Sequence, residues 1–350
     1  GDAHLDGGTD LVEHLGGHRV EAVVVGAHAP ELLGDVEAEQ PLGAGLLPDV
    51  TVDGVDLAVR AGEAYGLVGP NGAGKTTTLR LLVGALRPDA GSVTIAGIDL
   101  AQRPDAARAS IGYLAQRFSL YGDLTVLENL RFFAQVRGIR EAAFATRARD
   151  LLGFVGLDGF EGRLADHLSG GMKQKLGLAC ALVHEPPVLL LDEPTAGVDP
   201  VTRQEFWKLL ARILAAGRAL VVSTPYMDEA ARCTRVGFMH AGRILVEGSP
   251  RQLTAPMEGR VLELAARPSR SARDIALADP DVVDALAFGD RLHLHVSDAA
   301  GPMARLPQAL AEGGVDVERL RPIPASMEDV FISLLAERRA AAVESQVPAG

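Results

Sequence analysis

The sequence has little of what marks several classes of protein. Its two cysteines, Cys180 and Cys233, are too few for a disulfide framework, and no spacing of Cys and His indicates a zinc site. No run approaches the roughly 18 consecutive apolar residues that a membrane-spanning helix needs. Acidic residues outnumber basic ones by 46 to 34, so the basic stripe typical of nucleic-acid-binding proteins is missing. We therefore expect no transmembrane segment and no nucleic-acid partner.

Length and composition indicate a folded protein of more than one domain. A chain of 350 residues suggests two or three domains, and 47% hydrophobic with 23% charged residues is typical of globular proteins. Residues 1–45 contain one apolar run, Ala22–Val25, which is as compatible with a short strand as with a loose leader. No function is assigned to this segment.

Residues 46–250 alternate short apolar runs with longer amphipathic stretches. This alternation predicts an α/β domain with a largely parallel sheet. The predicted strands are Val55–Val59, Ala64–Val68, Ser92–Ile95, Gly112–Ala115, Val188–Leu191, Ala219–Ser223, Arg235–Met239 and Arg243–Glu247. The predicted helices are Lys75–Val83, Val126–Arg137, Glu141–Val155, Gly170–Val183, Pro200–Ala216 and Tyr226–Arg232.

Residues 251–340 predict a smaller α+β domain in the order βαββαβ, followed by a terminal helix. Residues 341–350 contain turn formers and are expected to fray. The predicted elements are strand Arg260–Ala265, helix Ala272–Leu277, strands Val282–Ala287 and Arg291–Val296, helix Met303–Glu312, strand Val315–Pro322 and helix Met327–Arg338.

One glycine-rich segment carries the strongest functional signal. It lies between a predicted strand and a predicted helix and reads Gly69-Pro70-Asn71-Gly72-Ala73-Gly74-Lys75-Thr76. This is the G-x-x-x-x-G-K-[ST] pattern of a phosphate-binding P-loop in its required context. The backbone N–H groups and the helix N-terminus would face the phosphates. Lys75 would bridge the β- and γ-phosphates of ATP, Thr76 would hold Mg²⁺, and Thr77 would add a phosphate contact.

Two carboxylates complete the predicted catalytic site. The apolar strand Val188–Leu191 ends in Asp192 and Glu193. Asp192 would reach Mg²⁺, and Glu193 would polarise the water that attacks the γ-phosphate, as a general base. A simple Asp-Glu turn is the alternative, but two charges at the end of a buried strand are costly without partners.

A third motif points to a family. The segment Leu168-Ser169-Gly170-Gly171, with Gln174 three residues later, precedes a predicted helix, and Ser169 is a plausible N-cap. With the P-loop it resembles the signature sequence of ATP-binding cassette (ABC) ATPases. Gln116 is similar to the family's Q-loop residue, which contacts Mg²⁺, and Asp199 to its D-loop residue. The resemblance implies a P-loop cassette with a mixed sheet core and a helical subdomain. It also implies a head-to-tail dimer in which the signature residues of one subunit close over ATP on the other.

Two positions depart from the family pattern. Pro225 stands where a histidine would contact the γ-phosphate, and proline offers neither an imidazole nor a backbone N–H donor. Loss of one such donor typically costs roughly 10²–10³ in rate, so we expect slowed hydrolysis unless another group or a partner subunit compensates. The expected adenine-stacking aromatic, near Leu46, is also missing, because no Phe, Tyr or Trp precedes Tyr65. We therefore expect looser, less base-selective nucleotide binding.

The end of the chain narrows the predicted role. Pro324–Ile332 is similar to the Ser-Leu-Glu-Asp-Val-Phe-Ile ending of daunorubicin-type and related multidrug exporter ATPases. The same residues form an amphipathic helix with Met327, Val330, Phe331 and Leu334 on one face, and both interpretations can hold. The resemblance implies an ATPase subunit on the cytoplasmic face of the membrane. It would be held there by a separate permease that docks around residues 117–124.

Three functions are compatible with these motifs. The first is the energy-coupling ATPase of an exporter for drugs or other small molecules, working as a homodimer or as a heterodimer. The second is a regulatory cassette that binds ATP and hydrolyses it poorly. The third is a cassette protein without a transport role, which the single cassette and the acidic balance disfavour.

Overall fold

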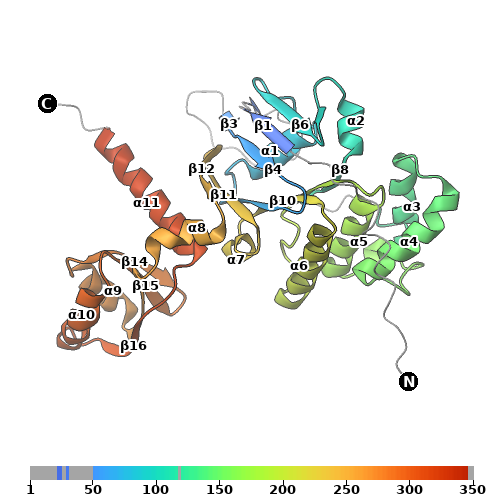
Figure 1. Ribbon diagram of the computed structural model, residues 1–350. Helices are drawn as coiled ribbons and strands as arrows, with labels where there is room; N and C mark the ends of the chain where they lie inside the picture. The colour runs from blue at the N-terminus through green and yellow to red at the C-terminus, as the bar shows by residue number, and fades with distance from the viewer. Residues whose placement is uncertain (1–21, 26–28, 31–49, 117–119, 346–350) are drawn as a thin grey trace, which may run out of the picture. The chain divides into compact units, whose positions relative to one another are not determined.

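The protein is described by a computed structural model that covers residues 22–25, 29–30, 50–116 and 120–345. The chain divides into two compact units, Gly1–Glu247 and Gly248–Gly350 (Figure 1). Each unit has its own hydrophobic core, and each is described by itself below.

The centre of the first unit is a six-stranded sheet in the order β12-β11-β5-β10-β9-β8. The pairs that join β11, β5, β10, β9 and β8 are all parallel, which confirms the predicted largely parallel sheet. Every residue of β5, β9 and β10 is buried, as expected for strands covered on both faces. The strands are β5 (Ala64–Val68), β8 (Ile111–Leu114), β9 (Val188–Asp192), β10 (Ala219–Thr224), β11 (Arg235–His240) and β12 (Arg243–Gly248).

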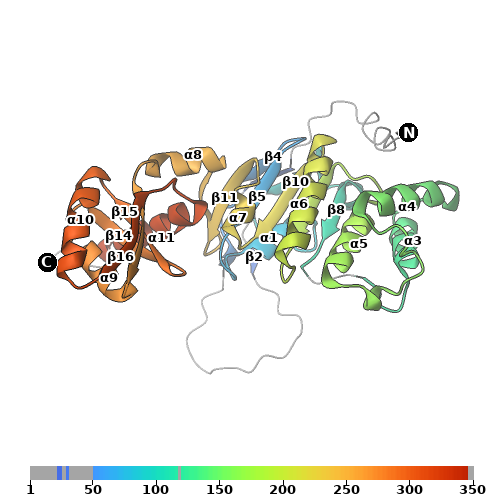
Figure 2. The ribbon, with the colours of Figure 1, turned by 90° about the horizontal axis from the view of Figure 1, so that it is seen from below.

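The helices of this unit begin and end close to the predicted residues. Helix α1 packs against β9 and β10, and α5 packs against α3 and α4 (Figure 2). The short helix α2 was not predicted, because six residues are too few to show a helical pattern of apolar side chains. The helices are α1 (Lys75–Leu82), α2 (Pro104–Ala109), α3 (Val126–Val136), α4 (Glu141–Val155), α5 (Gly170–Leu182), α6 (Pro200–Ala215) and α7 (Met227–Ala230), with a 3₁₀ turn at Ala165–His167.

A second sheet of this unit has the order β4-β1-β6-β7. The apolar run Ala22–Val25 is a strand, β1, and it pairs antiparallel with both β4 and β6. One core joins the two sheets through α1, with Val59 and Ile95 from one sheet and Leu190 from the other. The remaining strands are β4 (Leu57–Val59), β6 (Ser92–Ile95) and β7 (Ile98–Asp99), and β2 (Ala29–Pro30) and β3 (Val50–Val52) form a separate pair.

The second unit has the predicted βαββαβ order. Its four strands form an antiparallel sheet in the order β14-β15-β13-β16. Alternate residues of β15, Leu292 and Leu294, belong to the core that α9 and α10 cover. The elements are α8 (Pro250–Thr254), a 3₁₀ turn (Ala255–Met257), β13 (Val261–Arg267), α9 (Ser269–Leu277), β14 (Val282–Phe288), β15 (Arg291–Val296), α10 (Ala300–Glu312), β16 (Asp316–Pro322) and α11 (Met327–Ser345).

The predicted end of the terminal helix was wrong. Helix α11 continues past Arg338 to Ser345, into residues that we expected to fray. The added residues Ala340-Ala341-Ala342 have the highest intrinsic helix propensity, which outweighs the turn formers that follow. Among the described residues, no helix has both the length and the apolar character needed to cross a membrane.

A buried carboxylate fixes the start of α11 to the sheet. Asp329 is fully buried, and one of its oxygens contacts His293 Nδ1 at 2.9 Å and His295 Nε2 at 3.1 Å. Its other oxygen accepts hydrogen bonds from the N–H and the hydroxyl of Ser326, at 2.8 and 2.6 Å. Burial alone would raise the pKa of Asp329, but the hydrogen bonds from His295, Ser326 and His293 lower it well below its usual range.

We expect Asp329→Asn to loosen the start of α11 in a pH-dependent way. Because the folded pKa is depressed, the ionised carboxylate stabilises this unit above the unfolded pKa of about 3.9, and the contribution is lost as the pH falls below it. Charged hydrogen bonds contribute roughly 1.5–3 kcal/mol, so amides of β15 and α11 should exchange at least about tenfold faster in the variant at pH 7. The difference should persist at pH 4 and shrink as the pH is lowered toward 2. Asp274→Asn, an exposed change on α9, is the control, and equal exchange in both variants would contradict the assignment.

Candidate functional site

The predicted P-loop lies between the end of β5 and the start of α1. Gly69 cannot be replaced, because a Cβ atom there would lie 2.1 Å from the carbonyl oxygen of Met239. Gly74, the N-cap of α1, has φ +105°, a conformation that favours glycine. No acidic residue occupies the first turn of α1, so its free N–H groups face no competing carboxylate from their own helix. The loop therefore has the geometry of an anion-binding site.

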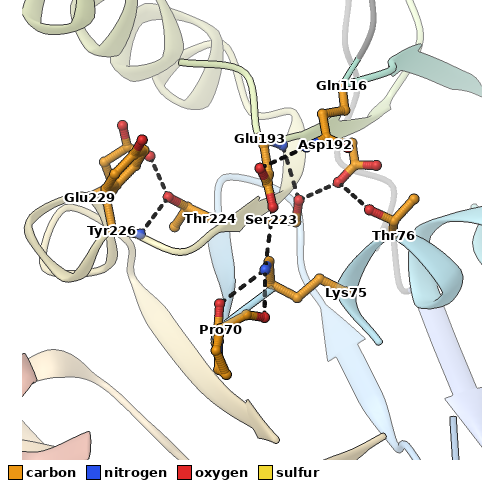
Figure 3. Close-up of polar contacts among 11 residues, drawn as sticks. Pro70, Lys75, Thr76, Gln116, Asp192, Glu193, Ser223, Thr224, Tyr226 and Glu229 are labelled. Carbon is orange, nitrogen blue, oxygen red and sulfur yellow. Dashed lines mark hydrogen bonds and ion pairs between the residues drawn. The ribbon is translucent and has the colours of Figure 1, made fainter. Parts of the chain in front are cut away.

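Lys75 and Glu193 form the buried centre of the site (Figure 3). The ammonium of Lys75 donates hydrogen bonds to the carbonyls of Gly69 and Pro70, at 2.9 and 3.1 Å, and lies 3.3 Å from Glu193 Oε1. Gln116 Nε2 donates to the other oxygen of Glu193 at 2.9 Å. The lysine side chain is 4% exposed and that of Glu193 10%. The structure thus brings three predicted catalytic residues into direct contact.

Asp192 has one oxygen occupied and one free. Its Oδ1 accepts hydrogen bonds from the hydroxyls of Thr76, at 3.2 Å, and Ser223. Its Oδ2 is buried and has no hydrogen-bond partner among the described residues. Such an orphaned carboxylate oxygen beside a threonine hydroxyl fits a Mg²⁺ ion. The described residues contain no cluster of three or more His, Cys, Asp or Glu that could hold a metal unaided, so phosphate oxygens and water would complete its coordination.

Ser223 is a site residue that the sequence analysis missed. It lies on β10 directly beside Asp192 on β9. Besides donating to Asp192, its hydroxyl accepts the N–H of Glu193 at 3.0 Å, and its carbonyl accepts the same N–H at 3.1 Å. These bonds hold Glu193 at φ +46°, an uncommon conformation for a residue with a side chain. The sequence did contain one indication of this role, because Ser223 is a polar residue that directly follows the apolar run Ala219–Val222.

A second buried carboxylate, Glu229 on α7, was also missed. It accepts hydrogen bonds from the hydroxyl of Thr195 and, at 2.6 Å, from that of Thr224. Arg203 of α6 lies 3.5 Å away, and its guanidinium also stacks on the ring of Tyr226 at 4.5 Å. This cluster ties the loop after β9 to the loop after β10, and so fixes the backbone on both sides of Pro225.

Pro225 lies half-buried between β10 and α7, within the segment that Glu229 anchors. The neighbouring N–H, that of Tyr226, donates to the hydroxyl of Thr224 at 3.1 Å. A histidine at position 225 would offer two donors, its imidazole and its backbone N–H, and proline offers neither. The adjacent N–H of Tyr226 does not replace them, because it is already bonded to Thr224.

Among the described residues, no hydrogen bond or ion pair joins the signature residues to residues 69–77 of the P-loop. Ser169 is exposed and caps α5 by accepting the N–H of Met172 at 3.3 Å. Leu168 is buried, and Gly171 packs so closely on Thr202 that a Cβ would lie 2.3 Å from its methyl group. Asp199 caps α6 by accepting the N–H groups of Val201 and Thr202, and these bonds with Thr202 lower the pKa of Asp199. The start of α5 and the start of α6 thus form one surface.

Gln174 links that surface to the buried centre. Its amide nitrogen donates to the carbonyl of Pro194, directly after Glu193, while its amide oxygen is buried without a hydrogen-bond partner among the described residues. On β8, burial and the nearby charge of Asp192 together raise the pKa of Tyr113 to about 12.

Two predictions fall partly or wholly outside the described residues. Leu46, the expected adenine-stacking position, lies outside them, and so do residues 117–119 of the predicted docking segment. Tyr65 is fully buried, and its hydroxyl donates to Glu247 at 2.7 Å, so its ring is part of the core and is not available for a base.

Residues 52–196 match the family model described as ABC transporter. The chain is 44% identical over 286 residues to the "Probable multidrug ABC transporter ATP-binding protein YbhF" of Escherichia coli (strain K12), a match covering 80% of this chain and 48% of that protein. The chain therefore spans about half the length of YbhF. It is 41% identical over 285 residues to the "Nod factor export ATP-binding protein I" of Paraburkholderia xenovorans (strain LB400), covering 81% of this chain and 91% of that protein.

Solved structures give the same result for the fold. The "Structure of ATP binding subunit of ABC transporter" is similar with a TM-score of 0.57 and 29% identity, over 67% of this chain and 92% of that one. The dimeric, post-hydrolysis cassette MJ0796 bound to ADP and Pi is similar with a TM-score of 0.57 and 25% identity, over 65% of this chain and 98% of that one. The predicted cassette fold with its small α+β addition is confirmed.

We expect Glu229→Ala to destabilise the first unit strongly. The change leaves the hydroxyls of Thr195 and Thr224 without their buried acceptor and Arg203 without its buried ion-pair partner. Breaking such a pair typically costs about 3–5 kcal/mol. Asp228→Ala is a matched control, because Asp228 faces the same arginine at 3.8 Å but is 61% exposed. Its loss should cost under about 1 kcal/mol. Urea unfolding followed by the fluorescence of Trp207, the only tryptophan, measures both. Similar losses in the two variants would contradict the role of Glu229.

Proposed function

The chain belongs to the ABC transporter ATP-binding proteins, and we propose that it binds ATP with Mg²⁺ and hydrolyses it to drive export through a separate membrane subunit. The observation that carries this proposal is the convergence of Lys75, Asp192 and Glu193, all buried, at the carboxyl ends of β5 and β9. Ligands bind at this edge of parallel sheets in open α/β folds. In this proposal residues 46–250 form the cassette and residues 251–340 an accessory domain.

The proposed chemistry assigns one role to each buried group. The free backbone N–H groups of the P-loop and the Lys75 ammonium would bind the β- and γ-phosphates. Thr76, Asp192 and Gln116 would hold Mg²⁺, which neutralises charge on the phosphates when bound. Glu193 would take the proton of the attacking water. Its position depends on Ser223 through the backbone N–H, and on Gln116 through the carboxylate.

The exposure of Ser169 and Gly170 favours catalysis by a dimer. Ser169 points to solvent at the positive end of α5, on the surface shared with Asp199 of α6. A phosphate-binding serine and helix N-terminus placed away from their own P-loop are useful only to a second subunit. A homodimer and a heterodimer with another cassette are both compatible with this surface.

An exposed aromatic group supports docking to a membrane subunit. The rings of Tyr121 and Phe132 meet edge to face at 4.7 Å, although the two residues are 45% and 36% exposed. The buried Asn129 fixes this segment by exchanging two hydrogen bonds of 2.9 Å with the backbone of Tyr121. The group follows the Gln116 segment along the chain, so a permease bound there lies close to a residue that contacts Glu193. Through this permease the protein would lie at the cytoplasmic face of the membrane.

The proposed cargo is a drug or another small molecule. Two observations support an exporter: the names of the two relatives, one a multidrug and one a Nod factor export protein, and the Pro324–Ile332 ending. The side chains Met327, Val330 and Phe331 of this ending are buried in the second unit. The alternative, a regulatory cassette that binds ATP but turns it over poorly, is favoured by one residue, Pro225.

The proposal predicts Mg²⁺-dependent release of phosphate from ATP by the purified chain. Glu193→Gln should bind ATP as tightly as the wild type but hydrolyse it at least about a hundredfold more slowly, because the general base is lost. Lys75→Met should weaken ATP binding itself. Arg149→Met, an exposed change on α4, is the control. If wild type and Glu193→Gln both bind ATP and hydrolyse it equally slowly, the regulatory alternative holds.

Restoring the histidine tests the effect of the switch position. We expect Pro225→His to raise kcat for ATP by roughly tenfold or more, because it returns a charge-stabilising donor to the transition state. KM should change little if the donor acts in the transition state alone. Unchanged kcat with an unchanged fold, checked by circular dichroism, would mean that another group already compensates.

A further inference from the structure

A cleft on the first unit has no part in the nucleotide chemistry. It lies between α4, the end of α5 and the end of α6, and has a volume of about 560 Å³. The three helices are neighbours in Figure 2. Its apolar wall includes Leu151, Phe154, Leu182 and Ile213. Sites of roughly 300–1,000 Å³ with an apolar lining and a few polar groups are typical of small-molecule binding.

One charged side chain of the cleft has no partner among the described residues. Arg218 lines the cleft and is 5% exposed. Its side chain forms no hydrogen bond or ion pair with any described residue. The charges of Glu185 and Arg147 act on its pKa from a distance, the first raising it and the second lowering it. Burial lowers the pKa of Arg218, because removing the guanidinium from water disfavours its charged form. In the described part of the chain, no nitrogen of Arg218 is among the fully buried polar atoms that lack a partner, so the guanidinium is reached from the cleft, where an anion would pair with it.

The other arginines of the cleft are already engaged. Arg147 pairs with Glu185 at 3.1 Å, and Arg212 stacks on Phe154 at 4.4 Å. With Arg147, Arg212 and Arg218 against Asp150 and Glu185, the lining carries three positive and two negative charges, a formal excess of one. The surroundings of the neighbouring His184 are also positive. Burial and the charges of Arg137, Arg218 and Arg147 lower the pKa of His184 to about 4. A ligand with one negative charge would balance the site.

The cleft is separate from the nucleotide site. Arg218 precedes β10, whereas Ser223 and Thr224 at the other end of that strand belong to the site around Asp192. Six residues of strand span roughly 20 Å. The backbone of Arg218 is fixed as well, because its carbonyl accepts the N–H of Gly62 at 3.1 Å.

From the unpaired Arg218 in an apolar cleft, we infer a second ligand site on this protein, for a small amphipathic monoanion whose carboxylate pairs with Arg218 and whose hydrocarbon part packs against Phe154 and Ile213. A nucleotide carries more negative charge than the lining balances, and a free phosphate has no hydrocarbon part to fill the cleft. The two sites can therefore be occupied together.

Binding of 2-naphthoate to the full chain, measured by isothermal titration calorimetry, tests this inference. We expect saturable binding at one site, the same with and without ATP present. The neutral analogue 2-naphthol should bind at least about tenfold more weakly. Arg218→Met keeps the length and apolar stem of the side chain and should weaken 2-naphthoate binding roughly tenfold to a hundredfold.

Two controls keep the result interpretable. Arg149→Met removes an exposed charge from α4 without touching the cleft and should bind as the wild type does. Arg218→Lys restores a cation and should recover part of the affinity, which separates loss of charge from loss of fold. The inference is overturned by absence of binding to the wild type, by equal binding to Arg218→Met, or by competition with ATP.

Discussion

Everything at the nucleotide site depends on pairing charges that the fold buries. Parallel strands with both faces covered end in Asp192 and Glu193 on β9, and Lys75 follows at the start of α1. Each charge has a partner from another element: Lys75 with Glu193, Gln116 with Glu193, and Thr76 and Ser223 with Asp192. Removing one partner would leave another charge buried alone, so the site is held as a unit and not as separate residues.

The same constraint recurs around two other buried carboxylates. Glu229 ties the loops after β9 and β10 together, and Asp329 ties α11 to β15, each through buried hydrogen bonds to a carboxylate. In both cases the pairing is complete within the chain. Two other groups differ. Asp192 Oδ2 is buried with no hydrogen-bond partner among the described residues, and the guanidinium of Arg218 lines the cleft with no hydrogen bond or ion pair to any of them. A metal ion with ATP would pair the first, and an organic anion the second.

Local patterns in the sequence were enough to predict most elements and the centre of the site. The P-loop and the Asp192–Glu193 pair are runs of adjacent residues, so their chemistry can be inferred from the sequence without knowledge of the tertiary structure. Ser223 and Glu229 were missed, because their partners Asp192 and Thr195 are more than thirty residues away and only the β9–β10 register brings them together. The end of α11 was misplaced for a different reason: alanine propensity extended a helix beyond its amphipathic part.

The central claim is that ATP is bound between the P-loop of one subunit and the exposed Ser169 surface of another. The mass of Glu193→Gln in solution, measured by light scattering with and without ATP, tests it most directly, because this variant should bind ATP without consuming it. We predict a monomer without ATP and a dimer with it, and no dimer when Ser169→Arg is added. If ATP is bound but the mass stays that of a monomer, the homodimer is contradicted. If an equimolar mixture with a second cassette subunit also fails to associate, the dimeric site is contradicted altogether.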